Sequence, residues 1–255
     1  MLHFTSTQIL AWLGAWFYPL CRIAALVGTA PVLSDSGAPQ RVKIALAIAI
    51  TAVVGPTVDS VPAADLASWE GLAVVARQIV IGAAMGMTMR VTFAAFTYAG
   101  DMIGLQMGLG FATLFDPQHN QQTPVVGSLL SYLAALIFLA LNGHLILIGA
   151  VAESFRSLPV ASASGMTLDW RALVDQGALT FVLALHIALP VIAALLLANA
   201  ILGVMMRSAP QLNLFAIGFP ATLLIGAAAL YFALPDMLGA IQRGLVDAMG
   251  RIIPW

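Results

Sequence analysis

The sequence predicts an all-α integral membrane protein, and two observations carry this prediction. Of the 255 residues, 61% are hydrophobic and only 8% are charged, and the mean hydropathy is +0.99, whereas about a quarter of the residues in an average soluble domain are charged. Apolar stretches also recur along the chain, separated by polar or proline-containing segments. We therefore expect about six apolar helical segments that form hairpins across the membrane.

Composition also excludes several functions. The formal net charge is -1 and no basic run is present, so we expect no binding to nucleic acid. The single cysteine, Cys21, has no partner for a disulfide or a metal site, and the four histidines lack the spacing of a metal site. Because the sequence holds neither a catalytic serine motif nor a phosphate-binding loop, we expect no catalytic residue, no metal and no cofactor.

The first apolar segment covers residues 9–33 and contains Arg22. A charge within a membrane helix is costly, and it usually faces a protein partner or a cavity. We expect a structural pairing of Arg22, for instance with a carboxylate on a neighbouring subunit, in preference to a transport role.

Two loops of opposite charge flank the second segment. The loop at residues 34–43 carries Arg41 and Lys43, whereas the loop at residues 57–71 is acidic. Since Lys and Arg accumulate on the cytoplasmic side of a membrane, we expect the first loop in the cytoplasm. The apolar segment between the loops, residues 44–55, barely reaches the length of a crossing, which leaves open that it lies partly within protein.

The longest apolar run extends over residues 72–115 and holds no turn signal. One helix of about 40 residues would measure about 60 Å, twice the thickness of the hydrocarbon core. The run is therefore either broken or re-entrant near Arg90, or it belongs to an assembly that rises out of the bilayer. Glycines recur in it at a spacing of four residues and would form a face for close helix packing: Gly82, Gly86, Gly100, Gly104 and Gly108.

Asp101 is the acidic residue most deeply placed in an apolar stretch. We expect it to pair with Arg22, Arg90 or a cation of a partner, and proton relay is the alternative role.

A polar, irregular segment follows this run. Gly110 ends the glycine spacing, Phe111 and Phe115 come next, and the turn signal Asp116-Pro117 opens a polar stretch. The backbone groups of such a loop lack partners in lipid, so the loop must lie in water, inside protein or along a wet cavity. The two phenylalanines beside the glycines are either ordinary packing or a flexible plug.

Three further apolar segments follow, at residues 125–151, 177–206 and 214–234. The longest polar stretch, residues 153–176, separates the first of them from the other two. Pro190 and Pro220 should bend these two segments, which are expected to form a bent hairpin. The C-terminal residues 235–255 have an amphipathic pattern, and docking on a partner helix or lying on the bilayer surface are both open.

Several motifs carry a resemblance to a known family. They are FDPQ at residues 115–118, TP at 123–124, LNGH at 141–144 and above all APQLNLFAIGFP at 209–220. The chain resembles the FliR/SctT family of type III secretion export gates, and the similarity covers essentially the whole chain in length and in the order of segments.

The resemblance implies a non-enzymatic subunit of the flagellar export gate. Such a subunit forms a helical, pore-containing assembly with FliP and FliQ in the bacterial inner membrane, contacts FlhB and FlhA, and lets unfolded flagellar subunits pass. Membrane lipid is a further expected partner. The alternative is a small-solute or proton-coupled transporter with Asp101 as the relay, but such transporters usually have internal repeats and no convincing repeat is visible in the sequence.

The resemblance also implies a division of the chain. A FliP-like part would cover residues 1–176, a FliQ-like hairpin residues 177–234 and a tail residues 235–255. The tip of the hairpin would face the cytoplasmic entrance of the pore with Arg207, Pro210, Gln211 and Asn213. A loop over residues 106–122 would plug the closed pore with Met107, Gly108, Gly110, Phe111, Phe115, Asp116 and Pro117. Where family members often have glycines after the Asp-Pro turn, this chain has HNQQ at 119–122, a departure that would stiffen the loop or add hydrogen bonds across it.

Overall fold

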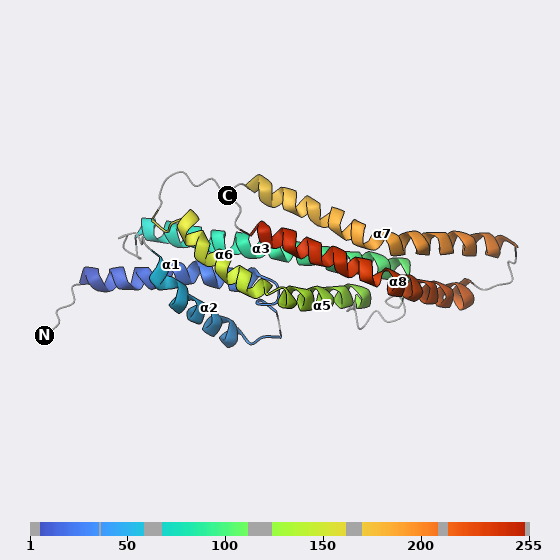
Figure 1. Ribbon diagram of the computed structural model, residues 1–255, viewed down its shortest axis with the longest axis horizontal. Coiled ribbons are helices and arrows are strands. Elements are labelled where there is room, and N and C mark those ends of the chain that lie inside the picture. Colours follow the sequence, from blue (N-terminus) through green and yellow to red (C-terminus); the bar gives the residue numbers. More distant parts are fainter. Residues whose placement is uncertain are drawn as a thin grey trace. The chain divides into compact units, whose positions relative to one another are not determined.

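The structure is a computed structural model that describes residues 6–35, 37–58, 68–111, 124–161, 170–208 and 214–252 (Figure 1). These residues form α-helices, short 3-10 turns and loops, and no strand occurs among them. The elements in chain order are α1 (Ser6–Thr29), α2 (Gln40–Val54), η1 (Gly55–Thr57), α3 (Trp69–Gln106), η2 (Leu109–Phe111), α5 (Val125–Ala140), α6 (Gly143–Ser157), α7 (Trp170–Ser208) and α8 (Leu214–Gly250).

Four helical stretches of the described chain are long and apolar enough to cross a membrane. They are Gln40–Thr57, Trp69–Gln106, Val174–Ser208 and Gly218–Gly250, and α5 with α6 adds a fifth if this bent pair is one span. The all-α membrane fold predicted from composition is therefore confirmed.

The start of α2 corrects one expectation. The helix begins at Gln40, directly after Pro39 with φ -56°, so Arg41 and Lys43 lie in its first turn and not in a loop. Pro39 is the N-cap residue with an extended ψ of 142°, and its carbonyl accepts a hydrogen bond from the backbone N of Val42 at 2.9 Å. Lys43 Nζ donates to the carbonyl of Ser34, 2.9 Å away, which ties the helix to the preceding connection.

The long apolar run is a single helix. α3 extends over 38 residues without an internal proline, which at 1.5 Å per residue is about 57 Å. A break near Arg90 is therefore ruled out, and the helix is about twice as long as the hydrocarbon core is thick.

The segment expected over residues 125–151 is two helices. α5 ends at Ala140 and α6 begins at Gly143, because Asn142 between them takes the left-handed conformation, with φ 55° and ψ 30°. Asparagine tolerates this conformation better than most residues with a side chain. α6 then continues to Ser157, so the polar stretch expected from residue 153 begins inside a helix.

Helix α8 corrects the expectation of a separate C-terminal tail. It continues through Pro235 to Gly250, as membrane helices can when other groups satisfy the carbonyl that a proline leaves free. The apolar stripe of the predicted tail is buried within this chain at Met237, Ile241, Leu245, Ala248 and Ile252. The charged residues of the pattern, Asp236, Arg243, Asp247 and Arg251, are exposed.

The chain divides into two compact units. Unit 1 comprises Met1–Val91, Asn142–Gln176 and Asp247–Trp255, and unit 2 comprises Thr92–Leu141 and Gly177–Val246. In unit 1, buried apolar side chains of α1, α3 and α6 form the core, including Ile23, Leu26, Ile81, Met85, Leu147 and Val151. In unit 2, Phe93 packs edge-on against Phe96 and Phe138, with ring centroids 5.9 and 5.8 Å away. The division into a FliP-like part and a FliQ-like hairpin stays a prediction.

Candidate functional site

Arg22 is completely buried at the centre of unit 1. Its Nε donates to Oε1 of Gln78 at 2.8 Å, and its Nη1 donates to the carbonyl and the hydroxyl of Ser154 at 2.8 and 3.0 Å. Its Nη2 donates to the carbonyl of Leu158 at 2.8 Å, and the guanidinium lies 4.2 Å from the ring centroid of Phe155. Arg22 is thus held within the chain by neutral oxygens and an aromatic face.

Arg22 binds the C-terminal end of α6, at Ser154 and the C-cap residue Leu158, and Arg77 binds the residues that follow. Arg77 Nη2 donates to the carbonyl of Val160 at 2.5 Å and, more weakly, to that of Pro159 at 3.5 Å. The last carbonyls of a helix have no partner within the helix and carry a partial negative charge, so cations are stabilising there. The two arginines therefore fix the point where the chain leaves α6.

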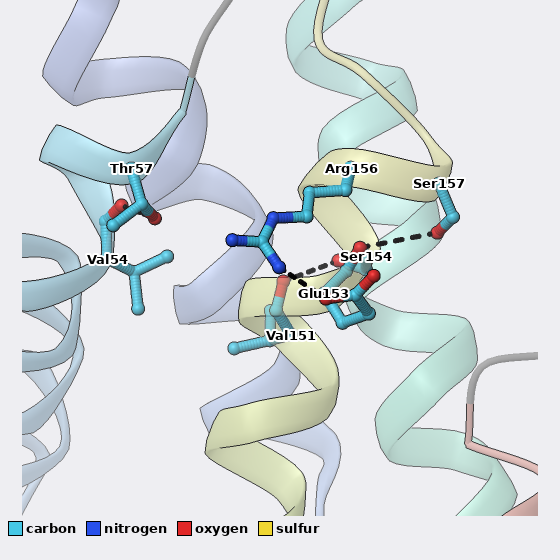
Figure 2. A network of polar contacts seen from close by, with 7 residues as sticks. All are labelled: Val54, Thr57, Val151, Glu153, Ser154, Arg156 and Ser157. Carbon is cyan, nitrogen blue, oxygen red and sulfur yellow. Dashed lines mark hydrogen bonds and ion pairs between the residues drawn. The ribbon is translucent and has the colours of Figure 1, made fainter.

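Figure 2 shows two further polar contacts at the same helix end, one exposed and one buried. Arg156 Nη1 pairs with Oε2 of Glu153 at 3.1 Å, and the hydroxyl of Ser154 donates to the carbonyl of Val151 at 2.7 Å. The Glu153–Arg156 pair is mostly exposed, and such pairs contribute little to stability. The arginine that organises this region is the buried Arg22.

Two of the predicted packing glycines face α1 within unit 1. A Cβ atom built on Gly82 would overlap the carbonyl oxygen of Arg22, and one built on Gly86 would overlap Oγ1 of Thr29. The backbone of α3 can approach α1 this closely only because these positions carry no side chain.

The other three predicted packing glycines lie in unit 2 and differ among themselves. A Cβ atom on Gly100 would lie 2.5 Å from the backbone Cα and N of Gly127, at the start of α5. A Cβ atom on Gly104 would meet only side chains at ordinary distances, 3.7 Å from Leu109 and 3.9 Å from Val126. Gly108 lies beyond the end of α3, with φ 85°, so the glycine face of the helix ends at Gly104.

Asp101 lies next to this helix crossing. A Cβ atom on Gly127 would overlap its Oδ1, which is buried and has no hydrogen-bond partner among the described residues. The position beside the first turn of α5 suits a carboxylate, because the N-terminus of a helix carries a partial positive charge. Neither Arg22 nor Arg90 bonds to this buried oxygen, and the role of Asp101 stays a prediction.

The predicted plug begins where α3 ends. Met107 is 5% exposed, and its carbonyl accepts a hydrogen bond of 3.2 Å from Oγ1 of Thr222 on α8. Gly108 follows with φ 85°, which a glycine adopts without steric cost, and η2 carries the chain to Phe111. The side chain of Phe111, and Phe115, Asp116 and Pro117 entirely, lie outside the described residues.

At the predicted hairpin tip, Arg207 is exposed in the last turn of α7. Pro210, Gln211 and Asn213 lie outside the described residues. Within the described part of the chain, no group of three His, Cys, Asp or Glu side chains could hold a metal ion.

Comparison with known proteins places these features in a family. The model of the family described as bacterial export proteins, family 1, matches residues 13–248. The chain belongs to this family. As a family 1 export protein, it is similar to several curated relatives, each called flagellar biosynthetic protein FliR. The relative from Escherichia coli (strain K12) is 44% identical over 237 residues, which cover 92% of this chain and 90% of the relative.

Two other relatives show how far the similarity of this family 1 export protein extends. FliR of Pectobacterium carotovorum subsp. carotovorum is 41% identical over 237 residues, with 92% of this chain and 90% of the relative covered. FliR of Aquifex aeolicus (strain VF5) is 32% identical over 214 residues, with 84% and 83% covered. The matched residues, 13–248, include Arg22 with its hydrogen-bond partners and the turn at Met107.

Sequence reasoning missed Gln78, Ser154 and Thr222 as members of these arrangements, and also Gly226 on α8, at which a Cβ atom would lie 2.5 Å from Cγ of Met107. Gln78 is a polar residue inside an apolar run and stands beside Arg77, which is a signal that could have found it. Thr222 and Gly226 have no such signal, because threonine and glycine are ordinary residues in membrane helices.

Proposed function

We propose that this chain is a subunit of the flagellar type III secretion export gate. In this proposal it forms, with FliP and FliQ, the bacterial inner-membrane pore through which unfolded flagellar proteins leave the cell. FlhB and FlhA contact the same assembly at the flagellar basal body, and other components supply the energy.

One observation carries the proposal. A bacterial export family matches residues 13–248, and the relatives that cover most of the chain are flagellar biosynthetic proteins. Together with its membrane-length helices, this makes the chain a membrane-embedded component of flagellar export. The family belongs to an export apparatus and is not a known family of enzymes. The pore, its partners and the inner membrane are the further steps that we propose.

The length of the helices supports an assembly with protein partners. α3, α7 and α8 have 38, 39 and 37 residues, so each is about 55 to 60 Å long. A hydrocarbon core of about 30 Å covers only about half of such a helix. The rest of its apolar surface needs protein around it.

Much of the apolar surface of α7 is exposed. One narrow face is buried, including Ala184, Ile187, Val191 and Leu195, whereas large apolar side chains point outward on the other faces. They include Phe181, Val182, Leu189, Leu197, Ile201 and Val204. A helix that is apolar on all sides is typical of the interior of a larger protein or of a membrane. FliP, FliQ and lipid are the neighbours that we propose for it.

The closed state of the pore follows from the predicted plug. Glycines at 108 and 110 give the loop backbone freedom, and Phe111 and Phe115 supply apolar bulk. A hydrophobic constriction excludes water and therefore resists ions. In this proposal the loop over residues 106–122 closes the pore until a substrate moves it.

The proposal is tested by deleting residues 110–122. The variant should still co-purify with FliP and FliQ, because the loop closes the pore and does not hold the assembly together, but cells carrying it should conduct ions through the membrane. A deletion that stays as ion-tight as the parent would contradict the plug, and a parent chain that does not co-purify with FliP and FliQ would contradict the gate.

Asp101 is the observation that favours a second candidate, a small-solute or proton-coupled transporter. Its Oδ1 is buried without a partner among the described residues, and intramembrane carboxylates often relay protons. The purified chain alone would then transport a solute into liposomes, and Asp101→Asn would abolish that transport. The match to an export family favours the gate.

A further inference from the structure

His186 is a polar residue on the outside of α7, in the most apolar of the membrane-length stretches of the described chain. It is exposed, and no hydrogen bond joins its imidazole to another described residue. The nearest charged residues along the helix are Asp175 and Arg207, which at 1.5 Å per residue lie about 16 and 31 Å away along the axis. His186 therefore presents a hydrogen-bonding side chain far from either charged end of the helix.

Pro190 adds an open backbone acceptor at the same place. In an α-helix the carbonyl of each residue accepts from the N–H four residues later, but proline has no N–H to give to the carbonyl of His186. Pro190 is exposed, and it lies on the same face as His186 because residues four apart share a face. α7 bends part-way along its length (Figure 1), as helices with an internal proline usually do. The imidazole and the carbonyl of one residue thus stand together on an exposed face.

Lipid is a poor neighbour for this face. Hydrocarbon offers no hydrogen bond, and a backbone carbonyl or an imidazole left without one costs free energy there. Beyond the proline, Ala193 and Ala194 are also exposed, and their small side chains let the backbone of another helix approach closely. A face that combines polar groups with small residues is typical of contacts between membrane helices.

The two polar groups of His186 also restrict the chemistry of the neighbour. The carbonyl needs a donor, and a neutral imidazole offers one donor and one acceptor. A hydroxyl or an amide side chain can donate and accept at once, whereas an ammonium group only donates and a carboxylate only accepts. A charged neighbour would also be costly in the apolar part of a membrane. The complementary residue is therefore a serine, threonine, asparagine or glutamine.

We propose that the His186 face, which we define as His186, Pro190, Ala193 and Ala194, docks against a membrane helix of another protein subunit that places a hydroxyl or amide side chain opposite His186. That side chain donates to the carbonyl of His186 and accepts from its imidazole N–H. The inference rests on the proposed function, which supplies other membrane subunits as neighbours, and it adds the position and the chemistry of one contact.

The test uses substitutions in the full chain, expressed with FliP and FliQ and washed in detergent. His186→Leu removes the polar side chain, and His186→Asn keeps a donor and an acceptor. Leu185→Ala is the matched control, because Leu185 is the adjacent residue and is 47% exposed but has no polar side chain. His186→Leu should lower the ratio of retained to released FliP and FliQ about three- to twentyfold, the range for one hydrogen bond between membrane helices. His186→Asn and Leu185→Ala should be retained like the parent.

A second measurement separates docking from folding. Because the side chain of His186 is exposed within this chain, the thermal unfolding midpoint of the chain purified alone should be the same for the parent and for His186→Leu. A lower midpoint for His186→Leu would show that His186 supports the fold, and the docking proposal would be refuted.

Cross-linking identifies the neighbour. A photoreactive phenylalanine analogue replaces Val182, which lies four residues before His186 on the same face and is 64% exposed. Irradiation of the assembled complex should join it to another protein subunit, close to a serine, threonine, asparagine or glutamine. When that residue of the neighbour is replaced by leucine, His186→Leu should cause no further loss of retention, because the hydrogen bond is already absent.

The outcomes distinguish the docking face from the proposed function. If the parent co-purifies with FliP and FliQ and His186→Leu is retained equally well, the docking face is refuted and the gate stands. Equal losses for His186→Leu and Leu185→Ala would show that apolar packing alone holds the face, which also refutes it. Adducts with lipid only, or with a second copy of this chain, contradict the proposed neighbour. If the parent does not co-purify, the gate fails and the docking face fails with it.

Discussion

The crossing of α3 and α5 in unit 2 offers the sharpest test of the packing. In Gly100→Ala the new Cβ would lie 2.5 Å from both Cα and N of Gly127 and 2.6 Å from the carbonyl carbon of Val126. Carbon atoms in favourable contact are about 3.5 to 4.0 Å apart, so the two backbones must separate by about 1 Å. The contacting atoms are all backbone, so no side chain can rotate away to make room.

The expected cost follows from this overlap. Forcing one extra methyl group into a closely packed site typically costs about 1 to 3 kcal/mol, and in a protein of this size about 1 kcal/mol lowers the unfolding midpoint by about 2 to 4 °C. The overlap alone should therefore lower the midpoint of Gly100→Ala by about 2 to 12 °C, and the better helix propensity of alanine, about 1 kcal/mol, should reduce this drop by about 2 to 4 °C.

The assay is thermal unfolding of the protein purified in detergent, compared with Gly104→Ala as a matched control. The control adds the same atom to the same helix, but its Cβ would meet only side chains at 3.7 and 3.9 Å, so its midpoint should stay level or rise slightly. If Gly100→Ala and Gly104→Ala behave alike, the close crossing of α3 and α5 does not exist and the reasoning from the glycine contacts is refuted.

Two further pairs of substitutions test other parts of the fold by the same thermal assay. Arg22→Met removes the donors to Oε1 of Gln78 and to the carbonyl of Leu158, and each buried oxygen that loses its donor should cost about 1 to 3 kcal/mol. Arg156→Met at the exposed Glu153 pair should cost less than about 1 kcal/mol. Equal effects would show that Arg22 does not organise unit 1. Asn142→Gly should leave the stability nearly unchanged. Asn142→Ala should cost about 1 to 2 kcal/mol, because the backbone at residue 142 is left-handed. An Asn142→Ala variant as stable as the parent would contradict the observed break between α5 and α6.

Part of the candidate site could be predicted from the sequence. The burial of Arg22 follows from its place in an apolar run, and the four-residue spacing of the glycines indicates a packing face. The partners of these residues could not be predicted. Ser154 lies 132 residues from Arg22, and no local pattern links them. Nor does the sequence distinguish Gly100, which meets a backbone, from Gly104, which meets flexible side chains.

The boundaries of the helices, like the partners of these residues, could not be predicted from the sequence. Prolines at 220 and 235 and the asparagine at 142 are local signals, yet α8 passes through both prolines while the chain breaks at Asn142. A proline costs a helix one hydrogen bond, which burial of the surrounding apolar residues can offset. The left-handed residue at 142 depends on where the following helix must pack.

By itself the sequence determined the class of the protein, because hydropathy and charge are sums over residues and do not depend on how the chain is arranged. It also determined roughly where the apolar helices lie, since apolar runs in a membrane must satisfy their own backbone, but not where they begin, break and end. Only the tertiary structure decided which residues meet: Arg22 with the end of α6, Gly100 with Gly127, and Met107 with Thr222 and Gly226. These contacts join residues far apart in the chain, and close packing selects them only when the helices are brought together.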